Sequence, residues 1–234
     1  MKEEHVKWYS NNLGRDIETL VYGHQGYPVL IFPSSQGRYY EAKDFKLIDS
    51  ISWFIEQGKI KVYCPDSIDS GSWYNKGIHP ADKVKTHIGY DRFIHDELIE
   101  KMRYETGISQ ICITGPSFGA YHALNYAFRH PEKVSHLFAL SGKYDIKSFL
   151  GWYYDDNTYF NNPADFMQQA DNPELWNMKI ILSAGEHDIC KDATIHMSEI
   201  LNNKGIEHWL DIREGAVHDW PLWRNTLPHY LSLL

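Results

Sequence analysis

A serine between two glycines stands where a predicted strand meets a predicted helix. The segment ICITGPSFGAYHALNYAF, residues 111–128, begins with an apolar, partly β-branched run and continues with helical spacing. A sharp turn there would expose the hydroxyl of Ser117 at a helix N-terminus, where amide donors favour developing negative charge. Gly115 and Gly119 suit the close approach of strand and helix that such a turn requires. The pattern predicts a nucleophilic serine, and the alternative is a serine that only caps the helix.

A serine nucleophile needs a general base, usually a histidine that a carboxylate orients. Asp188 follows the predicted strand KIILSAGEH, and His218 lies in the loop after the last predicted strand. The order Ser, Asp, His along the chain is the order found in α/β-hydrolases. Both residues follow strands, as Ser117 does, so we expect all three at one edge of the sheet. Glu186 is the alternative acid. With an ordinary histidine pKa near ~6.5, hydrolysis should rise through neutral pH.

An oxyanion hole requires two backbone N–H donors. The residue after the nucleophile, Phe118, is expected to supply one of them. The other should come from the loop after an early strand, which reads FPSSQGRYY here. Ser35 is the predicted donor, with Ser34 and Gln36 as alternatives. The same letters also suit an ordinary loop that caps a helix.

The elements that must position these residues alternate between strands and helices. Such alternation predicts one α/β domain over residues 1–234, with a mostly parallel, twisted sheet and helices on both faces. An antiparallel pair of strands is expected at the start, and one helix is expected over residues 39–58. Functional side chains gather beyond the carboxyl ends of such strands. Residues 143–177 show no strand period and are rich in aromatic residues, which predicts a small cap over the site; a packing segment or a protein contact is the alternative.

Composition narrows the classes of function. The chain of 234 residues carries a formal net charge of −8 and has no basic patch, so nucleic acid is not an expected partner. The chain has no run of 18 consecutive apolar residues, so no membrane-spanning helix is expected. The N-terminus lacks a signal peptide and there are only three cysteines, so we expect a cytoplasmic protein without disulfides. No metal-binding or nucleotide-binding motif is present, so no metal and no cofactor are expected. Homo-oligomer formation is left open.

Together these motifs resemble the putative-esterase branch of the α/β-hydrolase superfamily. That branch includes esterase D (S-formylglutathione hydrolase), enterochelin esterases, some feruloyl and acetyl-xylan esterases, and the antigen 85 mycolyltransferases. The resemblance rests on GPSFGAYHALNYAFRHPEKV, AGEHD and GAVHDWPLWRNTLPHYL, and it spans nearly the whole chain. It implies an α/β-hydrolase fold and a catalytic triad of Ser117, Asp188 and His218. The loop FPSSQGR departs from many relatives, which have a glycine beside the donor.

The expected function is that of a serine carboxylic-ester hydrolase that forms an acyl-enzyme on a small ester or thioester. One alternative is an acyltransferase on the same scaffold, with an alcohol or a sugar as acceptor. The other is a non-catalytic binding protein with a hydrolase fold. The resemblance does not name the acyl group or the leaving group, because one fold serves many substrates.

Overall fold

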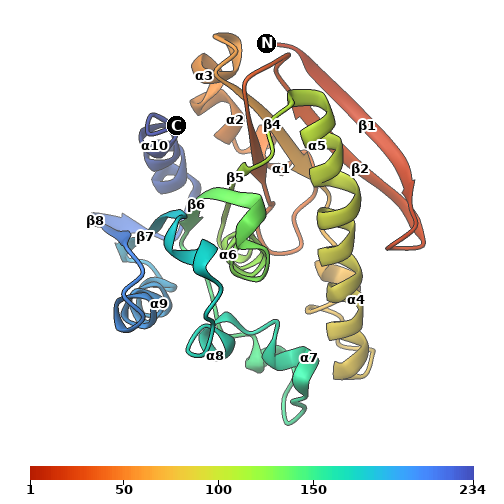
Figure 1. The fold of residues 1–234 in the computed structure, drawn as a ribbon, viewed down its shortest axis with the longest axis vertical. Helices are drawn as coiled ribbons and strands as arrows, with labels where there is room; N and C mark the ends of the chain where they lie inside the picture. The colour runs from red at the N-terminus through yellow and green to blue at the C-terminus, as the bar shows by residue number, and fades with distance from the viewer.

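Eight strands form one sheet in the order β1-β2-β4-β3-β5-β6-β7-β8. In this computed structural model, which describes all of residues 1–234, β1 pairs with β2 and β2 with β4 antiparallel, and the remaining neighbours pair parallel (Figure 1). The strands are β1 (Glu3–Ser10), β2 (Arg15–Tyr22), β3 (Tyr27–Ile31), β4 (Ile60–Pro65), β5 (Ile111–Pro116), β6 (Val134–Leu140), β7 (Lys179–His187) and β8 (His208–Val217). The predicted mostly parallel sheet with an antiparallel start is confirmed.

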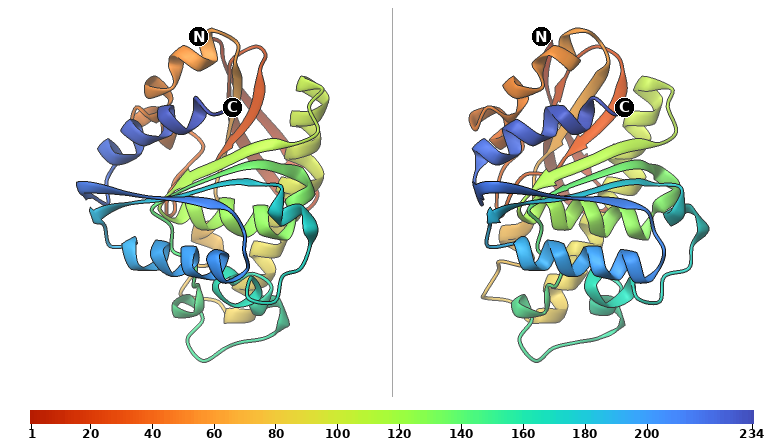
Figure 2. Two further views of the ribbon diagram at one scale, coloured as in Figure 1. Left: turned by 60° about the vertical axis from the view of Figure 1, so that its left-hand side comes forward. Right: turned by 90° about the vertical axis from the view of Figure 1, so that its left-hand side faces the viewer.

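Helices cover both faces of this sheet, as predicted (Figure 2). On one face lie α4, α5, α6 and α9; on the other lie the short helices α1 to α3 together with α10. The helices are α1 (Glu41–Asp44), α2 (Leu47–Ser50), α3 (Ser52–Glu56), α4 (Pro80–Arg92), α5 (Ile99–Thr106), α6 (Phe118–Arg129), α7 (Asp156–Tyr159), α8 (Pro163–Phe166), α9 (Lys191–Asn203) and α10 (Trp220–Leu231). None of them combines the length and the apolar character that spanning a bilayer requires.

Each inner strand sends alternate side chains into two hydrophobic cores. In β3, Val29 and Ile31 pack with the core under α10, whereas Leu30 packs with the core under α6. Parallel strands with helices on both faces are buried on both sides, which explains their nearly continuous apolar sequences. The core thereby holds the carboxyl ends of β5, β7 and β8 in fixed relative positions.

The predicted single helix over residues 39–58 is wrong. The structure has three short helices there, α1, α2 and α3. Lys46 lies between the first two in the left-handed region, with φ of 61°, and a residue in that region cannot continue an α-helix. The apolar spacing persists across the break because all three pieces pack on the same face of the sheet. The predicted end of this segment at Gly58, with φ of 64°, is confirmed.

A long helix crosses the molecule in three parts, α4, a π-helical segment η2 (Phe93–Leu98) and α5. It begins at Pro80. His79 caps it by accepting a hydrogen bond from a backbone amide, and proline suits the first helical position. Gly107, with φ of 71°, ends it.

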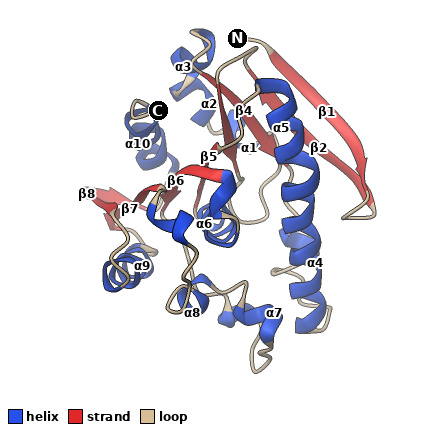
Figure 3. Cartoon of the chain, viewed as in Figure 1, coloured by secondary structure: helices blue, strands red, loops and turns tan.

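The segment 143–177 contains only short helical pieces and loops (Figure 3). These pieces are η4 (Lys147–Phe149), α7, α8 and η5 (Pro173–Trp176). Of its aromatic residues, Phe149 packs inward against Phe118, whereas Trp152 is 85% exposed. Part of this segment therefore contacts the neighbourhood of the predicted nucleophile, and part of it faces solvent.

Candidate active site

Ser117 occupies the sharp turn between β5 and α6. Its backbone has φ of 56° and ψ of −119°, a conformation that costs energy for any residue with a side chain. The Ser117 side chain makes no capping hydrogen bond to α6, so the alternative role of a helix cap does not describe it. The turn is held by the backbone, because the Ser117 N–H donates to the carbonyl of Leu140 on the neighbouring strand at 2.8 Å.

The two flanking glycines are required by contacts between backbones. A Cβ atom on Gly119 would lie 2.5 Å from the carbonyl oxygen of Pro33, and one on Gly115 would lie 2.7 Å from the Gly119 carbonyl group. The first turn of α6 thus sits directly on the chain that leaves β3. This close approach places the loop that begins at Pro33 next to the serine.

Ser117, His218 and Asp188 are brought together from three different strand ends. Ser117 Oγ lies 2.9 Å from His218 Nε2, and His218 Nδ1 lies 2.7 Å from Asp188 Oδ1. A carboxylate only accepts hydrogen bonds, so Nδ1 carries a proton, and in the neutral form of the imidazole Nε2 can accept the serine proton. The Asp188 side chain is fully buried, and its Oδ1 also accepts from the Cys190 amide at 2.7 Å.

The charges of the pair depend on this burial and on these hydrogen bonds. Burial alone would raise the pKa of Asp188, but hydrogen bonds from His218, from Ser141 and from a backbone amide hold that pKa below its ordinary value. Burial alone would lower the pKa of His218, but its hydrogen bonds to Asp188 and Cys190 raise that pKa to about 9. An ionised Asp188 therefore stabilises the protonated imidazole, which is the state that a general base reaches during catalysis.

The competing acidic residues make other contacts. Glu186 accepts the Gly215 amide at 2.9 Å on the surface. Asp219 accepts the amide of Trp220 at the start of α10. Neither carboxylate is hydrogen-bonded to His218, whereas Asp188 is.

The loop FPSSQGRYY offers the N–H groups of Ser34, Ser35 and Gln36 as possible oxyanion donors, and two of these three already donate to carboxylates. The Ser34 N–H donates to Glu41 Oε2 at 2.7 Å, and the Gln36 N–H donates to Asp69 Oδ2 at 3.0 Å. The Ser35 N–H makes no hydrogen bond within the protein, and neither does the Phe118 N–H. These two free donors belong to the two segments that meet at Gly119. The geometry thus favours Ser35 over its two alternatives.

Asp69 and Glu41 fix the loop from two sides. Asp69 is completely buried, and its second oxygen accepts from His122 Nε2 at 2.8 Å. Gln36 adopts the left-handed region, with φ of 56°, and its hydrogen bond to Asp69 helps to hold that conformation. Burial raises the pKa of Glu41, although its hydrogen bonds to Ser34 oppose the increase. Sequence reasoning missed both carboxylates, because neither lies in a recognisable motif.

Three aromatic rings form a wall beside this loop. Tyr74 and Phe149 both pack on Phe118, with ring centroids 5.4 and 5.3 Å away, and they contact each other at 5.0 Å. The hydroxyl of Tyr74 donates to Ser35 Oγ at 2.8 Å. We refer to Tyr74, Phe118 and Phe149 as the ring wall. Phe118 itself is buried, whereas Tyr74 and Phe149 are partly exposed, so these two rings give an apolar surface beside the Ser35 loop.

The back of the triad contains residues that the sequence did not single out for this role. Trp223 donates from Nε1 to Ser141 Oγ at 2.9 Å, and its ring meets the His218 ring edge to face at 5.2 Å. Ser141 is buried with φ of 57°, in the turn that follows β6. Trp223 thus packs α10 on the core and also contacts the triad.

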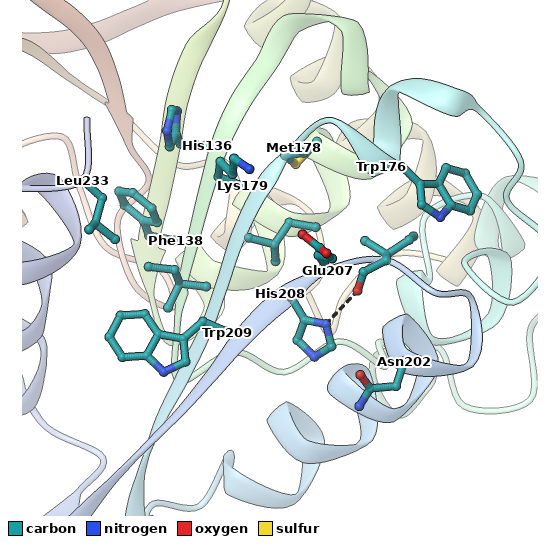
Figure 4. A pocket seen from close by; sticks show the side chains of 13 residues that line it. His136, Phe138, Trp176, Met178, Lys179, Asn202, Glu207, His208, Trp209 and Leu233 are labelled. Carbon is teal, nitrogen blue, oxygen red and sulfur yellow. Dashed lines mark hydrogen bonds between the residues drawn. The ribbon is translucent and has the colours of Figure 1, made fainter.

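A broad hollow on the surface lies away from these residues. It encloses about 730 Å³ and is lined by residues of β6, β7 and β8, among them His136, Lys179 and Trp209 in the amino halves of these strands (Figure 4). Ser117 lies at the opposite, carboxyl end of the parallel strands, where catalytic groups gather in such folds. We therefore assign the candidate active site to the triad and the ring wall, not to this hollow.

Comparisons with known proteins bear on the family and the fold of the chain. The family model described as "Putative esterase" matches residues 10–234. An S-formylglutathione hydrolase from Agrobacterium tumefaciens is 14% identical with a TM-score of 0.77, covering 99% of this chain and 93% of that one. Fluorophosphonate-binding serine hydrolase F of Staphylococcus aureus is 13% identical with a TM-score of 0.78, covering 99% and 97%. A ferulic acid esterase from Anaeromyces mucronatus is 15% identical with a TM-score of 0.72, covering 99% and 89%.

The structural likenesses, at such low identity, concern the fold, and they identify it as the α/β-hydrolase fold that the sequence predicts. The family match goes further, because it extends over nearly the entire chain. This protein therefore belongs to the putative esterase family.

Proposed function

We propose that this protein is a serine carboxylic-ester hydrolase that acts through an acyl-enzyme. One observation carries the proposal. Asp188, His218 and Ser117 form a continuous chain of hydrogen bonds of 2.7 and 2.9 Å, and the serine stands in a strained turn that presents its hydroxyl. A merely structural serine would have no need of a strained backbone, a histidine and a buried carboxylate together.

In the acylation step, Ser117 Oγ attacks the ester carbonyl carbon while its proton passes to His218 Nε2. The negative charge moves to the carbonyl oxygen, which accepts hydrogen bonds from the Phe118 and Ser35 amides. Asp188 stabilises the protonated imidazole. The tetrahedral intermediate then collapses, the bond to the leaving group breaks, and His218 returns its proton to that group.

In the deacylation step, a water molecule takes the place of the leaving group. His218 accepts a proton from this water as its oxygen attacks the acyl carbon. The second tetrahedral intermediate collapses, the bond to Ser117 Oγ breaks, and His218 protonates the serine. The products are a carboxylic acid and the original enzyme, and the cycle requires no cofactor.

The substrate is a small ester or thioester whose acyl group rests on the ring wall. Tyr74 and Phe149, which are partly exposed and pack on the buried Phe118, provide apolar contact beside the free amides, which suits a short acyl or an aryl group. The similar structures include an S-formylglutathione hydrolase and a ferulic acid esterase, so both a thioester and an aryl ester are worth testing.

The test is hydrolysis of a panel of acyl esters and thioesters by wild type, Ser117→Ala and the matched control Ser232→Ala. Ser232 lies on the surface near the C-terminus and bonds only to a neighbouring carbonyl. We expect Ser117→Ala to reduce kcat by at least about 10³-fold with its fold intact, and Ser232→Ala to match wild type. Activity in folded Ser117→Ala close to that of wild type would refute the mechanism. Transfer of the acyl group to an added alcohol in preference to water would instead identify an acyltransferase.

A further inference from the structure

A second cluster of reactive side chains lies at the far end of α6. His95 belongs to the π-helical segment η2, His130 follows α6 directly, and Glu132 lies in the short helix η3 (Pro131–Lys133). One possible ligand atom of each residue lies within 4.8 Å of the other two. The 12 residues of α6 separate this cluster from Ser117, a length of about 18 Å at the usual rise per residue. The proposed esterase mechanism does not use it.

His130 is oriented by a buried carboxylate. Its Nε2 lies 3.0 Å from Asp91 Oδ2, and the other oxygen of Asp91 pairs with Arg129 at 2.9 Å. Asp91 is only 6% exposed. An ionised carboxylate accepts hydrogen bonds and donates none, so Nε2 carries a proton, and Nδ1 has no hydrogen-bond partner in the structure. A carboxylate that fixes the tautomer of a histidine in this way is typical of metal-binding histidines.

His95 is oriented in a similar way by a buried hydroxyl. Its Nδ1 lies 2.9 Å from the phenol oxygen of Tyr126, which leaves Nε2 for another partner. The His95 and His130 rings lie 4.5 Å apart between centroids. Each imidazole thus has one nitrogen engaged with a supporting residue and one nitrogen that is not.

The neighbouring cations do not compete for the cluster. Lys133 Nζ pairs with Glu100 at 3.3 Å, and Arg129 is engaged by Asp91 and by Asn161. The exposed carboxylate of Glu132 takes part in no ion pair. Two neutral imidazoles and one carboxylate are a donor set that suits zinc and similar divalent transition metals.

We propose that His95, His130 and Glu132 bind one divalent transition-metal ion of the zinc type, with water completing the coordination. Zinc lies about 2.1 Å from such ligands, so binding would draw the three atoms inward. Glu132, on the surface, is free to make that movement. The ion would tie the π-helical segment to the end of α6. A π-helical turn within an α-helix is frequent at functional sites, which agrees with a ligand on this segment.

The experiment titrates metal-free protein with Zn²⁺ in competition with a chromophoric chelator, and with Co²⁺ followed by its visible spectrum. Variants are His95→Ala, His130→Ala and Glu132→Gln, the last at an exposed position where folding is not at risk. The matched control is His196→Ala, because His196 forms a lone exposed pair with Glu199 on α9. We expect one ion per chain, at least tenfold weaker binding in the three variants, and unchanged binding in the control.

A competing cluster makes the test decisive. Asp188, Cys190 and His218 also bring ligand atoms within 4.8 Å of one another. Binding there would add a thiolate-to-cobalt charge-transfer band, would be lost in Cys190→Ala and would persist in Glu132→Gln; that result would overturn the proposal. Absence of stoichiometric binding in folded wild type would overturn it as well. None of these measurements uses ester hydrolysis, so the metal site and the proposed function stand or fall separately.

Discussion

The coupling between Asp188 and His218 predicts an unusual pH dependence of hydrolysis. Replacing Asp188 by Asn keeps the size of the side chain and removes the charge that faces His218 Nδ1 at 2.7 Å. In wild type the pKa of His218 is raised to about 9. The free enzyme then holds the imidazole protonated at neutral pH, and kcat/KM rises with pH as the proton leaves. The sequence predicts that hydrolysis rises with pH near neutrality. The raised pKa of His218 instead places this rise in the alkaline range.

The magnitude follows from that pKa. The difference between about 9 and the ordinary value near ~6.5 is about 2.5, and each pH unit corresponds to ~1.4 kcal/mol, so the surroundings favour the charged imidazole by about 3 kcal/mol. Asp188 is the main source and Cys190 adds to it. We expect Asp188→Asn to lower the inflection by at least about one pH unit and to lower kcat by about 10³- to 10⁴-fold, because the tautomer is no longer fixed.

The assay is kcat/KM for one aryl ester from about pH 5 to about pH 10 in wild type, Asp188→Asn and Cys190→Ala. Cys190→Ala serves as the comparison, because it removes the smaller contribution and leaves the carboxylate in place. Its inflection should fall by less than that of Asp188→Asn. A wild-type inflection below neutrality, or the same inflection in Asp188→Asn, would refute the reasoning.

Three further predictions concern the surroundings of the triad. Gly119→Ala should reduce kcat by about 10²-fold or more, because the added Cβ displaces the oxyanion loop. Gly71→Ala should leave kcat unchanged, because a Cβ there meets no atom within 4 Å. Measuring kcat and Tm of both variants checks this. Asp69→Asn should lower kcat more than it changes KM, because the Ser35 amide acts on the transition state; an effect on KM alone would contradict it. Trp223→Phe, which loses one hydrogen bond of about 1 kcal/mol, should lower kcat roughly fivefold at unchanged substrate binding.

Local signals predicted the order of the elements and brought out the triad residues. Ser117 is marked by its two glycines, and Asp188 and His218 follow strands, so their common edge follows from the rules of parallel sheets. These rules need no knowledge of side-chain contacts. They also explain why Glu186, only two residues from Asp188, could not be dismissed until its contact with the Gly215 amide was visible.

The break at Lys46 could not be predicted, because the apolar spacing on both sides continues as if the helix were unbroken. Sequence reasoning misses the left-handed conformation of this single residue. A lysine rarely adopts that conformation, and tertiary packing imposes it here. The same applies to Gln36, whose left-handed conformation is held by a carboxylate 33 residues away.

The residues that support the site could not be predicted either, because they contact residues far away in the sequence. Asp69 meets His122 across 53 positions of sequence, and no motif joins them. His95 and His130 are separated by the rest of η2 and by α5, β5 and α6, so a search for compact metal-binding spacings does not find them. Sequence patterns expected no metal; the metal site proposed above comes from the folded arrangement alone.

The most direct test of the central claim is the intact mass of the protein after incubation with a fluorophosphonate. A phosphonate reacts with an activated serine and forms a stable adduct at Oγ, so the probe reports the nucleophile itself and not the choice of ester. We predict one adduct on wild type, none on folded Ser117→Ala, and one on Ser232→Ala. An unmodified wild type, or an adduct that persists in Ser117→Ala, would contradict the assignment of Ser117 as the nucleophile.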